Sequence, residues 1–414
     1  MRIIRCVESA AIVLLLLNTS HGSAQAEALT LEQAVDQALT RNPTVAAGHL
    51  FATAARESAR GARALTNPEM LVAPTVIGDG GSDSAAMFVQ PLEINGARNA
   101  RSRIATAEAD AASHRFEAAR RDMALQVKQI YWDLARTQEV VKLNEENVAY
   151  LETMDKAIRK QVEVGKIPGS QVLKSEVELA RARQQLAQAK LEIKNAKTAL
   201  AALLNSPADR DLRASDPLVC HSIDVDRSTL AAGALESRPE VLAKGARFEA
   251  SKARISAAQA RRIPDLVIEA RKESFDGGDS GLALSLTLPL LDWGSAKAEK
   301  RSAEIESAAE MKELEAARAA VVLELEQAVQ ALDTATRVAK EYEDGILEKS
   351  VQLAAMAQKG YEKGALNYLD VLEAQRTLRS VRTEYLSALA DQSKTVALLE
   401  WATGAGSGGA EVRK

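Results

Sequence analysis

The chain repeats one phrase almost 200 positions later, and this repeat limits the possible folds more than any other feature. The first copy reads QPLEINGARNAR and the second reads LPLLDWGSAKAEKR. Pro91 stands 198 residues before Pro289, and Gly96 stands 198 residues before Gly294. Repeats that stack into solenoids or propellers have periods of about 20 to 50 residues. A period this long therefore indicates two related halves within one chain.

Each half predicts a helical stretch followed by two strands around a loop rich in Gly, Asp and Ser. The helical stretches are expected over 29–64 and 237–260. The clearest strand, 282–288, alternates large apolar residues with small or polar ones, which is the two-residue period of a strand with one buried face. Its partner is expected over 265–273, and the first half has a matching strand over 69–77.

Strands with one apolar and one polar face are typical of a transmembrane barrel wall. No stretch of about 20 apolar residues occurs, so the sequence excludes membrane-spanning helices and leaves strands as the membrane contact. Four strands cannot close a barrel, whereas three copies supply twelve, and closure leaves no unpaired edge in lipid. The fold class expected is mainly α with a small β part, in which a trimeric twelve-stranded barrel continues into a helical coiled-coil tunnel.

The repeated phrase leads in each half into a very long helix. Between Gly96 and Val164 there is neither Pro nor Gly, which predicts a helix of about 100 Å. The matching helix, 294–361, is interrupted at Gly345. A seven-residue period of apolar or small residues predicts left-handed supercoiling, and it includes these residues in the two halves: Val127, Leu134, Val141 and Val148, then Leu325, Leu332, Ala339 and Ile346.

Each long helix ends at a glycine, Gly165 or Gly364, and the chain returns through a helix about half as long. The return helices are expected over 170–204 and 367–403. Two short helices stacked end to end beside one long helix form the wall of a tube rather than a compact core.

The N-terminus has the form of an export signal. Two arginines precede a short apolar run, and Ala24-Gln25-Ala26 gives an Ala-x-Ala cleavage site. We therefore divide the chain into a signal peptide (1–26), a first repeat (27–220), a second repeat (221–403) and a flexible tail (404–414).

Composition argues against an enzyme. The four histidines are scattered, and we find no paired metal motif, nucleophile elbow or phosphate-binding loop. Cys220 would be the single cysteine after cleavage, and with His221 it is too small a ligand set for a metal. No cofactor and no catalytic residue are expected, and the absence of a basic block excludes nucleic acid as a partner.

Several motifs together resemble the TolC family of trimeric outer-membrane channels. They are the twofold repeat, the strand start NPEM at 67–70, the junction QPLEINGAR at 90–98, and GALNYLDVLEAQ at 364–375. The likeness extends from about Leu29 to Thr403. The residues of the NPEM and QPLE motifs are most similar to those of the CzcC-like branch, which serves heavy-metal efflux.

The resemblance implies a periplasmic gate. The matching positions for an acidic ring are Asp370 and Glu373, and such a ring favours cations. Tyr361 matches the aromatic partner of the closed-state lock. Gln171 stands where an acidic lock residue is expected and Leu366 where a basic one is expected, which puts a salt-bridge latch in doubt.

A simpler interpretation of Asp370 needs no ring. An acid in the first turn of a helix interacts favourably with the helix dipole, and Asn367 would be the N-cap. The two interpretations are compatible, because one concerns the energy of the helix and the other its placement in an assembly.

The resemblance also implies partners and a mechanism. A homotrimer would sit in outer-membrane lipid, with a periplasmic adaptor contacting the hairpin tips at Gly165 and Gly364. An inner-membrane pump of the resistance-nodulation-division type would drive heavy-metal cations through it. Pro91, Gly96, Pro289 and Gly294 would form the barrel-to-tunnel junctions.

Other functions remain open. A multidrug or type I secretion channel would have the same architecture. A periplasmic coiled-coil adaptor or a soluble coiled-coil protein fits less well, because neither explains two matched halves that each carry alternating strands.

Overall fold

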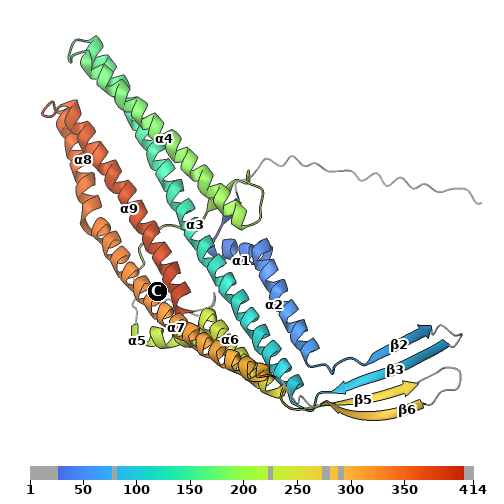
Figure 1. Cartoon of the computed structure of the whole chain (residues 1–414). Coiled ribbons are helices and arrows are strands. Elements are labelled where there is room, and N and C mark those ends of the chain that lie inside the picture. Colours follow the sequence, from blue (N-terminus) through green and yellow to red (C-terminus); the bar gives the residue numbers. More distant parts are fainter. Residues whose placement is uncertain (1–26, 77–81, 222–226, 273–279, 288–292, 405–414) are drawn as a thin grey trace, which may run out of the picture.

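The computed structural model describes residues 27–76, 82–221, 227–272, 280–287 and 293–404. The predicted signal peptide, Pro289 and the tail beyond Gly404 lie outside these residues. The protein is elongated, with a small sheet at one end and two helical hairpins at the other (Figure 1).

The element order repeats almost unchanged in the two halves. In the first half it runs β1 Glu27–Leu29, α1 Leu31–Arg41, α2 Pro43–Ala62, β2 Glu69–Val76, β3 Ser82–Leu92, α3 Ala97–Glu163, α4 Ser170–Leu203 and β4 Leu212–Ala214. In the second half it runs α5 Arg227–Ser237, α6 Pro239–Ala260, β5 Asp265–Lys272, β6 Ser280–Thr287, α7 Ser295–Glu341, the π-helical turn η1 Tyr342–Ile346, α8 Leu347–Glu362 and α9 Tyr368–Thr403.

The main sheet is antiparallel, in the order β2-β3-β5-β6. Leu92 at the end of β3 pairs with Leu266 of β5, so the strands of the two halves meet at the centre of the sheet. In β6 every second residue is a leucine, and Leu282, Leu284 and Leu286 are 80%, 67% and 50% exposed. One face of this strand is therefore apolar and uncovered within the chain.

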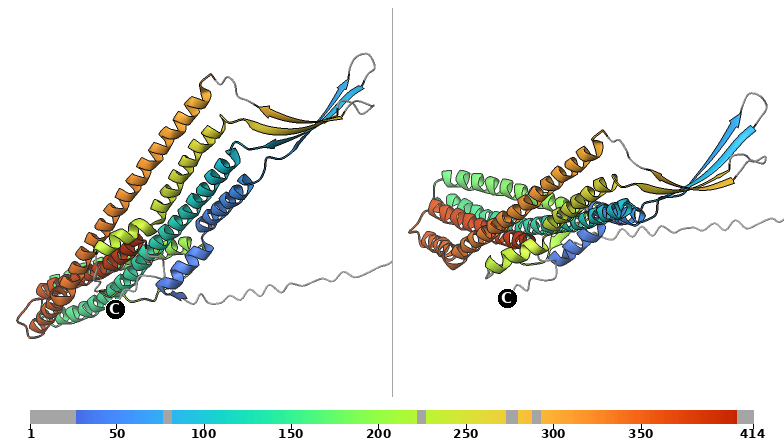
Figure 2. Two further views of the ribbon diagram at one scale, coloured as in Figure 1. Left: turned by 90° about the horizontal axis from the view of Figure 1, so that it is seen from below. Right: turned by 60° about the horizontal axis from the view of Figure 1, so that its bottom comes forward.

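Four helices continue the strands in the same order. α2 packs on α3, α3 on α6 and α6 on α7, and they form one layer whose ends meet the strands (Figure 2). α3 is a single helix of 67 residues, about 100 Å long, as the sequence predicted. α4 returns along α3, and α9 returns along α7 and α8.

The predicted strands and long helices are confirmed. The prediction of one continuous helical stretch over 29–64 is wrong. Leu29 belongs to β1, which pairs in parallel with β4. The stretch then breaks at Asn42, which caps α2, because Pro43 follows at the first helical position and cannot donate a backbone hydrogen bond. The second half breaks in the same way at Arg238, before Pro239.

The small β1–β4 sheet was not predicted from the sequence. Tyr131 of α3 is fully buried beneath it, donates its hydroxyl to the Leu29 carbonyl at 2.8 Å, and accepts a hydrogen bond from the Ser215 amide at 3.1 Å. This side chain fastens the start of the first half and the linker after it to the long helix.

The predicted seven-residue seam is buried over only part of each half. Val127 and Leu134 are fully buried. Further along α3, Val141 and Val148 are half-buried, and the buried positions shift to Val140, Leu143 and Leu151, because a straight helix drifts out of a seven-residue period.

In the second half the seam holds until the π turn. The exposed fractions of Leu325, Leu332 and Ala339 are 3% or less, whereas Ile346 is 42% exposed. The wider turn of η1, which contains Gly345, rotates the following residues away from the seam. The predicted interruption at Gly345 is therefore confirmed, and the seam predicted at Ile346 is wrong.

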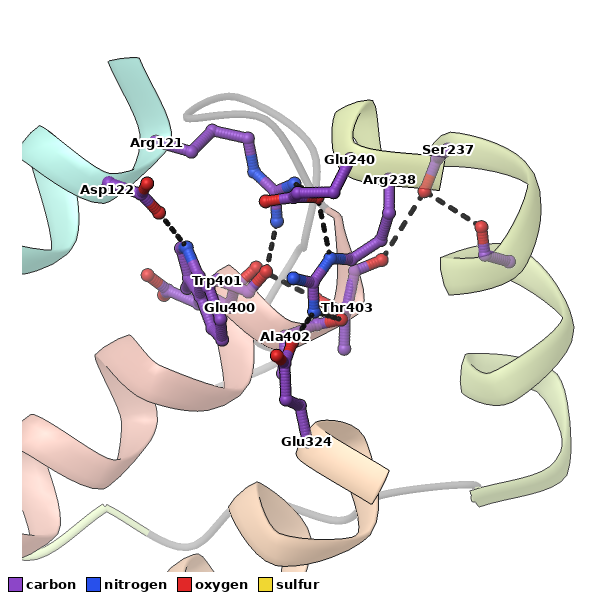
Figure 3. Close-up of polar contacts among 11 residues, drawn as sticks. Arg121, Asp122, Ser237, Arg238, Glu240, Glu324, Glu400, Trp401, Ala402 and Thr403 are labelled. Carbon is purple, nitrogen blue, oxygen red and sulfur yellow. Dashed lines mark hydrogen bonds and ion pairs between the residues drawn. The ribbon is translucent and has the colours of Figure 1, made fainter. Parts of the chain in front are cut away.

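A buried arginine, Arg238, connects three helices of the second half with α3 of the first half. Arg238 is 1% exposed and forms ion pairs with Glu240 at 3.0 Å and Glu324 at 2.7 Å (Figure 3). Its guanidinium lies 4.4 Å from the Trp401 ring centroid, a cation–π contact. Trp401 in turn donates its indole N–H to Asp122 of α3 at 2.8 Å. α6, α7, α9 and α3 are thus linked around one side chain.

Candidate functional site at the hairpin tips and the strand junction

Both hairpin tips use the same backbone motif. Gly165 has φ +72° and Gly364 has φ +74°, in the left-handed region that glycine adopts without strain. In the first tip the amides of Gly165 and Lys166 bond to the carbonyls of Val162 and Gln161, both at 2.9 Å. The second tip repeats this pattern, which is the Schellman motif that ends many helices. The predicted helix ends at both glycines are confirmed.

Asp370 caps α9. Asn367 is the N-cap and accepts hydrogen bonds from the amides of Leu369 and Asp370, while the Asp370 carboxylate accepts one from the Asn367 amide at 2.9 Å. This reciprocal capping box confirms the cap interpretation. Glu373 follows three residues later, so both carboxylates lie on one side of α9, and both are exposed.

The three predicted neighbours of the gate have different surroundings. The Tyr361 hydroxyl donates to the Gln161 side chain of the other hairpin at 3.3 Å. Leu366 packs on Gly360, where an added Cβ would lie 2.6 Å from a Leu366 methyl carbon. The side-chain oxygen of Gln171 is buried and accepts no hydrogen bond from the described residues. Gln171 and Leu366 are both uncharged, so these two side chains cannot form an ionic latch.

Other side chains join the two hairpins instead. Tyr150 donates to Gln358 at 2.9 Å, and Arg376 forms an ion pair with Glu178 of α4. Sequence reasoning missed these contacts. A signal was available, because three of the six tyrosines, Tyr150, Tyr361 and Tyr368, belong to the segments around the tips.

Tyr368 is the most deeply inserted of these tyrosines. It belongs to α9 but packs among Leu151, Met154 and Ile158 of α3, and it is 4% exposed. Burial, with a smaller contribution from the negative charge of Glu178, raises the pKa of Tyr368 to about 12. Its hydroxyl has no hydrogen-bond partner among the described residues. This ring holds the hairpins together by packing alone.

At the other end of the long helices, the junction follows the repeated phrase. Pro91 still pairs with Val267 in the sheet, and Gly96 and Gly294 then cap α3 and α7 with φ of +84° and +89°. At such values a side chain would be strained, so the matched glycines permit the sharp turn from strand to helix. Glu93 and Arg101 form an ion pair beside this turn, and that pair lowers the pKa of the Glu93 carboxyl.

The described residues contain no group of three or more His, Cys, Asp or Glu side chains placed to hold a metal. Cys220 is half-buried, and burial raises its thiol pKa. The neighbouring His221 amide donates to Gln392 at 3.0 Å. Across the described ranges, none of the helices combines the length and apolar character that crossing a membrane requires.

Known proteins match both halves. The family described as outer membrane efflux protein matches residues 34–206 and 230–405. The chain belongs to this family. It is therefore an outer-membrane efflux protein and not an enzyme, with its helical part in the periplasm.

Individual relatives agree with this family assignment. The cobalt-zinc-cadmium resistance protein CzcC of Cupriavidus metallidurans is 27% identical over 87% of this chain and 86% of its own. A membrane protein from Pseudomonas aeruginosa has a TM-score of 0.79 at 22% identity, covering 90% of this chain and 92% of that one. The open state of the Neisseria gonorrhoeae MtrE outer membrane channel has a TM-score of 0.78 at 22% identity and covers 93% of each chain. The predicted resemblance to the TolC family and to its CzcC-like branch is confirmed.

Proposed function

We propose that three copies of this chain form the outer-membrane channel of a tripartite efflux system. The four-stranded sheet supports this, because β2 and β6 lie at its two edges and have no further strand beside them among the described residues. Pairing the edges of three copies gives a closed barrel of twelve strands, in which the exposed leucines of β6 face lipid. The helical layer that continues the sheet becomes the wall of a tunnel.

Conduction through such a channel is passive, and the driving force comes from partners. A periplasmic adaptor contacts the hairpins around Gly165 and Gly364, and an inner-membrane pump of the resistance-nodulation-division type supplies the substrate. The supporting observation is the distance between sheet and tips, which α3 alone sets at about 100 Å. A chain with this shape reaches far from the membrane toward proteins that stand on the opposite side of the periplasm.

Heavy-metal cations are the proposed cargo, and the observation that carries this proposal is the similarity to CzcC over most of both chains. The exposed carboxylates of Asp370 and Glu373 fit a cationic cargo. In a trimer they form a ring of six acids near the tip, which attracts cations and repels anions. A multidrug or secretion channel has the same architecture, so the cargo requires its own experiment.

The test is a strain that lacks this gene, complemented with the full chain. We expect growth in cobalt, zinc or cadmium salts to depend on the chain, and the outer-membrane fraction to contain a detergent-extracted trimer. Dependence of drug tolerance or protein secretion, without any effect on metal tolerance, would assign one of the alternative channels. Recovery of a monomer in the periplasmic fraction would contradict the channel itself.

A further inference from the structure

The helix ends beside the sheet carry a dense positive charge. We define the junction belt as residues 56–63, 97–103, 254–262 and 295–301, which are the ends of α2, α3, α6 and α7 nearest the strands. Each of the four segments contains three Lys or Arg residues, and together they contain two acids, Glu57 and Glu299. The whole chain, by contrast, has a net charge of −4. The belt is therefore a positively charged zone, at the helix ends beside the sheet, in a chain that is negative overall.

The four segments lie together in space. The helices that carry them pack side by side in one layer, and their ends meet the start of the sheet (Figures 1 and 2). The side chains of Arg60, Arg261 and Arg301 are 75%, 68% and 73% exposed. These three side chains are also ion-paired, with Glu57, Glu299 and Glu304, so they show that the belt is exposed to solvent, while the cations available to a ligand are the ones without an acidic partner.

Half of the belt's cations lack an acidic partner. In the described part of the chain, no carboxylate comes within ion-pair distance of six of the twelve: Arg56, Arg63, Arg98, Arg103, Arg262 and Lys297. Arg101, by comparison, is used internally, since it binds Glu93 and also the carbonyls of Ala62 and Ala64. Like charges crowded in this way repel one another, so the arrangement favours a bound anion.

Two large apolar side chains stand at the same level. Trp293, just before α7, is 93% exposed, and Ile94, just before α3, is 63% exposed. They hold nearly matched positions in the repeated phrase of the two halves. Tryptophan is enriched where a membrane meets water, because its ring is apolar and its N–H is polar. The belt thus combines cations with an aromatic and an aliphatic anchor.

We propose that the junction belt binds the headgroups of anionic phospholipids in the periplasmic leaflet of the outer membrane. This rests on the proposed function, since it requires the adjacent sheet to cross the membrane. The belt then lies at headgroup level, where basic residues near an anionic surface each strengthen binding by about fivefold. Trp293 and Ile94 insert into the boundary between headgroups and acyl chains, which fixes the depth of the protein in the membrane.

The test is lipid retention by the full chain extracted from the outer membrane. The protein is exchanged into mixtures of zwitterionic phosphatidylethanolamine and anionic phosphatidylglycerol, and the retained lipids are counted by native mass spectrometry. The belt variant carries Arg63→Gln, Arg103→Gln, Arg262→Gln and Lys297→Gln, one change on each segment. The matched control removes the same charge elsewhere on exposed helix surfaces, with Arg115→Gln, Lys194→Gln, Arg318→Gln and Lys349→Gln.

We expect the wild-type protein and the control to retain phosphatidylglycerol preferentially, and the belt variant to lose at least tenfold of that preference, because four contributions of about fivefold each are removed. Raising the salt concentration should weaken retention by the wild type, which tests the proposal even if the variant does not fold. Phospholipids brominated near the headgroup should quench tryptophan fluorescence, and Trp293→Phe should remove most of the quenching.

Equal retention of the two lipids by the wild-type protein would overturn the proposal, as would equal losses in the belt variant and the control. Complete displacement of the lipid by inorganic phosphate would also overturn it, because the belt would then be a site for free anions. A trimer that reaches the outer membrane but shows no lipid preference contradicts this inference alone. Failure to reach the outer membrane contradicts the proposed function.

Discussion

Asn42 and Arg238 hold corresponding positions in the two halves, and each binds the C-terminal end of the helix that closes its own half. The Asn42 side chain donates to the Leu203 carbonyl of α4 at 3.0 Å, and the Arg238 guanidinium donates to the Ala402 carbonyl of α9 at 3.5 Å. Both residues precede a proline that begins a helix. The same connection is thus made once by a neutral amide and once by a buried charge.

This difference predicts unequal effects of truncation. Arg238→Ala should destabilise the protein by about 3 kcal/mol, because Glu240 and Glu324 lose their buried cation. Asn42→Ala should cost about 1 kcal/mol, since it removes a helix cap and one hydrogen bond. Thermal unfolding followed by the helical circular dichroism signal measures both. Equal shifts would show that the ion pairs around Arg238 contribute little.

The unpartnered hydroxyl of Tyr368 predicts that its removal is harmless at neutral pH. Tyr368→Phe should leave stability unchanged or raise it by up to about 1 kcal/mol, because the buried hydroxyl makes no hydrogen bond with the described residues. Tyr150→Phe is the control and should cost about 1 kcal/mol, since it deletes the 2.9 Å bond to Gln358. Amide hydrogen exchange over the hairpin tips would report both changes, and protection lost in Tyr368→Phe would contradict the prediction.

The same tyrosine predicts loosening of the tips in alkali. An unfolded tyrosine ionises near pH 10, whereas the pKa of folded Tyr368 is about 12. Above pH 10 the unfolded chain therefore releases a proton that the folded chain retains. Stability is present in full below pH 10 and declines as the pH approaches 12. Tyr368→Phe should show a smaller decline in exchange protection over this range, and an identical decline would exclude Tyr368 as its source.

The proposed acidic ring predicts a change in ion selectivity. Replacing Asp370 with Asn and Glu373 with Gln should reduce the preference of the trimer for cations in planar bilayers, because six carboxylates are neutralised. Asparagine keeps an acceptor for the Asn367 amide, so the cap of α9 should survive. The control, Glu192→Gln with Glu315→Gln, removes the same charge from exposed positions away from the tip. Selectivity that is equal in the two variants would exclude the ring.

The ion pair between Arg376 and Glu178 predicts an effect on the closed state. Arg376→Gln removes a contact between α9 and α4, and it should raise basal conductance about two- to fivefold, as expected for a partly exposed pair worth about 0.5 to 1 kcal/mol. Arg181→Gln is a close control, because Arg181 pairs with the same Glu178 but within α4. If the two variants leak equally, the contact between hairpins does not restrain opening.

The local elements of this protein could be predicted from its sequence. The absence of Pro and Gly along α3, the alternation in β6 and the glycines that end the long helices each act within a few turns of chain. For that reason the bounds of α3, α4, α9, β5 and β6 agree with prediction to within about two residues. The cap at Asp370 was predictable for the same reason. The 198-residue repeat adds that the two halves share one order of elements.

The contacts between hairpins and the belt could be found only in the tertiary structure. Tyr368 lies more than 200 residues from Leu151, yet it is buried against it, and Arg63, Arg103 and Arg262 come from three separate helices. The spacing of apolar residues along a helix predicts which side of that helix is apolar, but it does not predict which other helix covers that side. Partner choice depends on how long helices pack over their whole length. The sequence therefore determined the elements and their twofold order, and packing decided which side chains join the two halves.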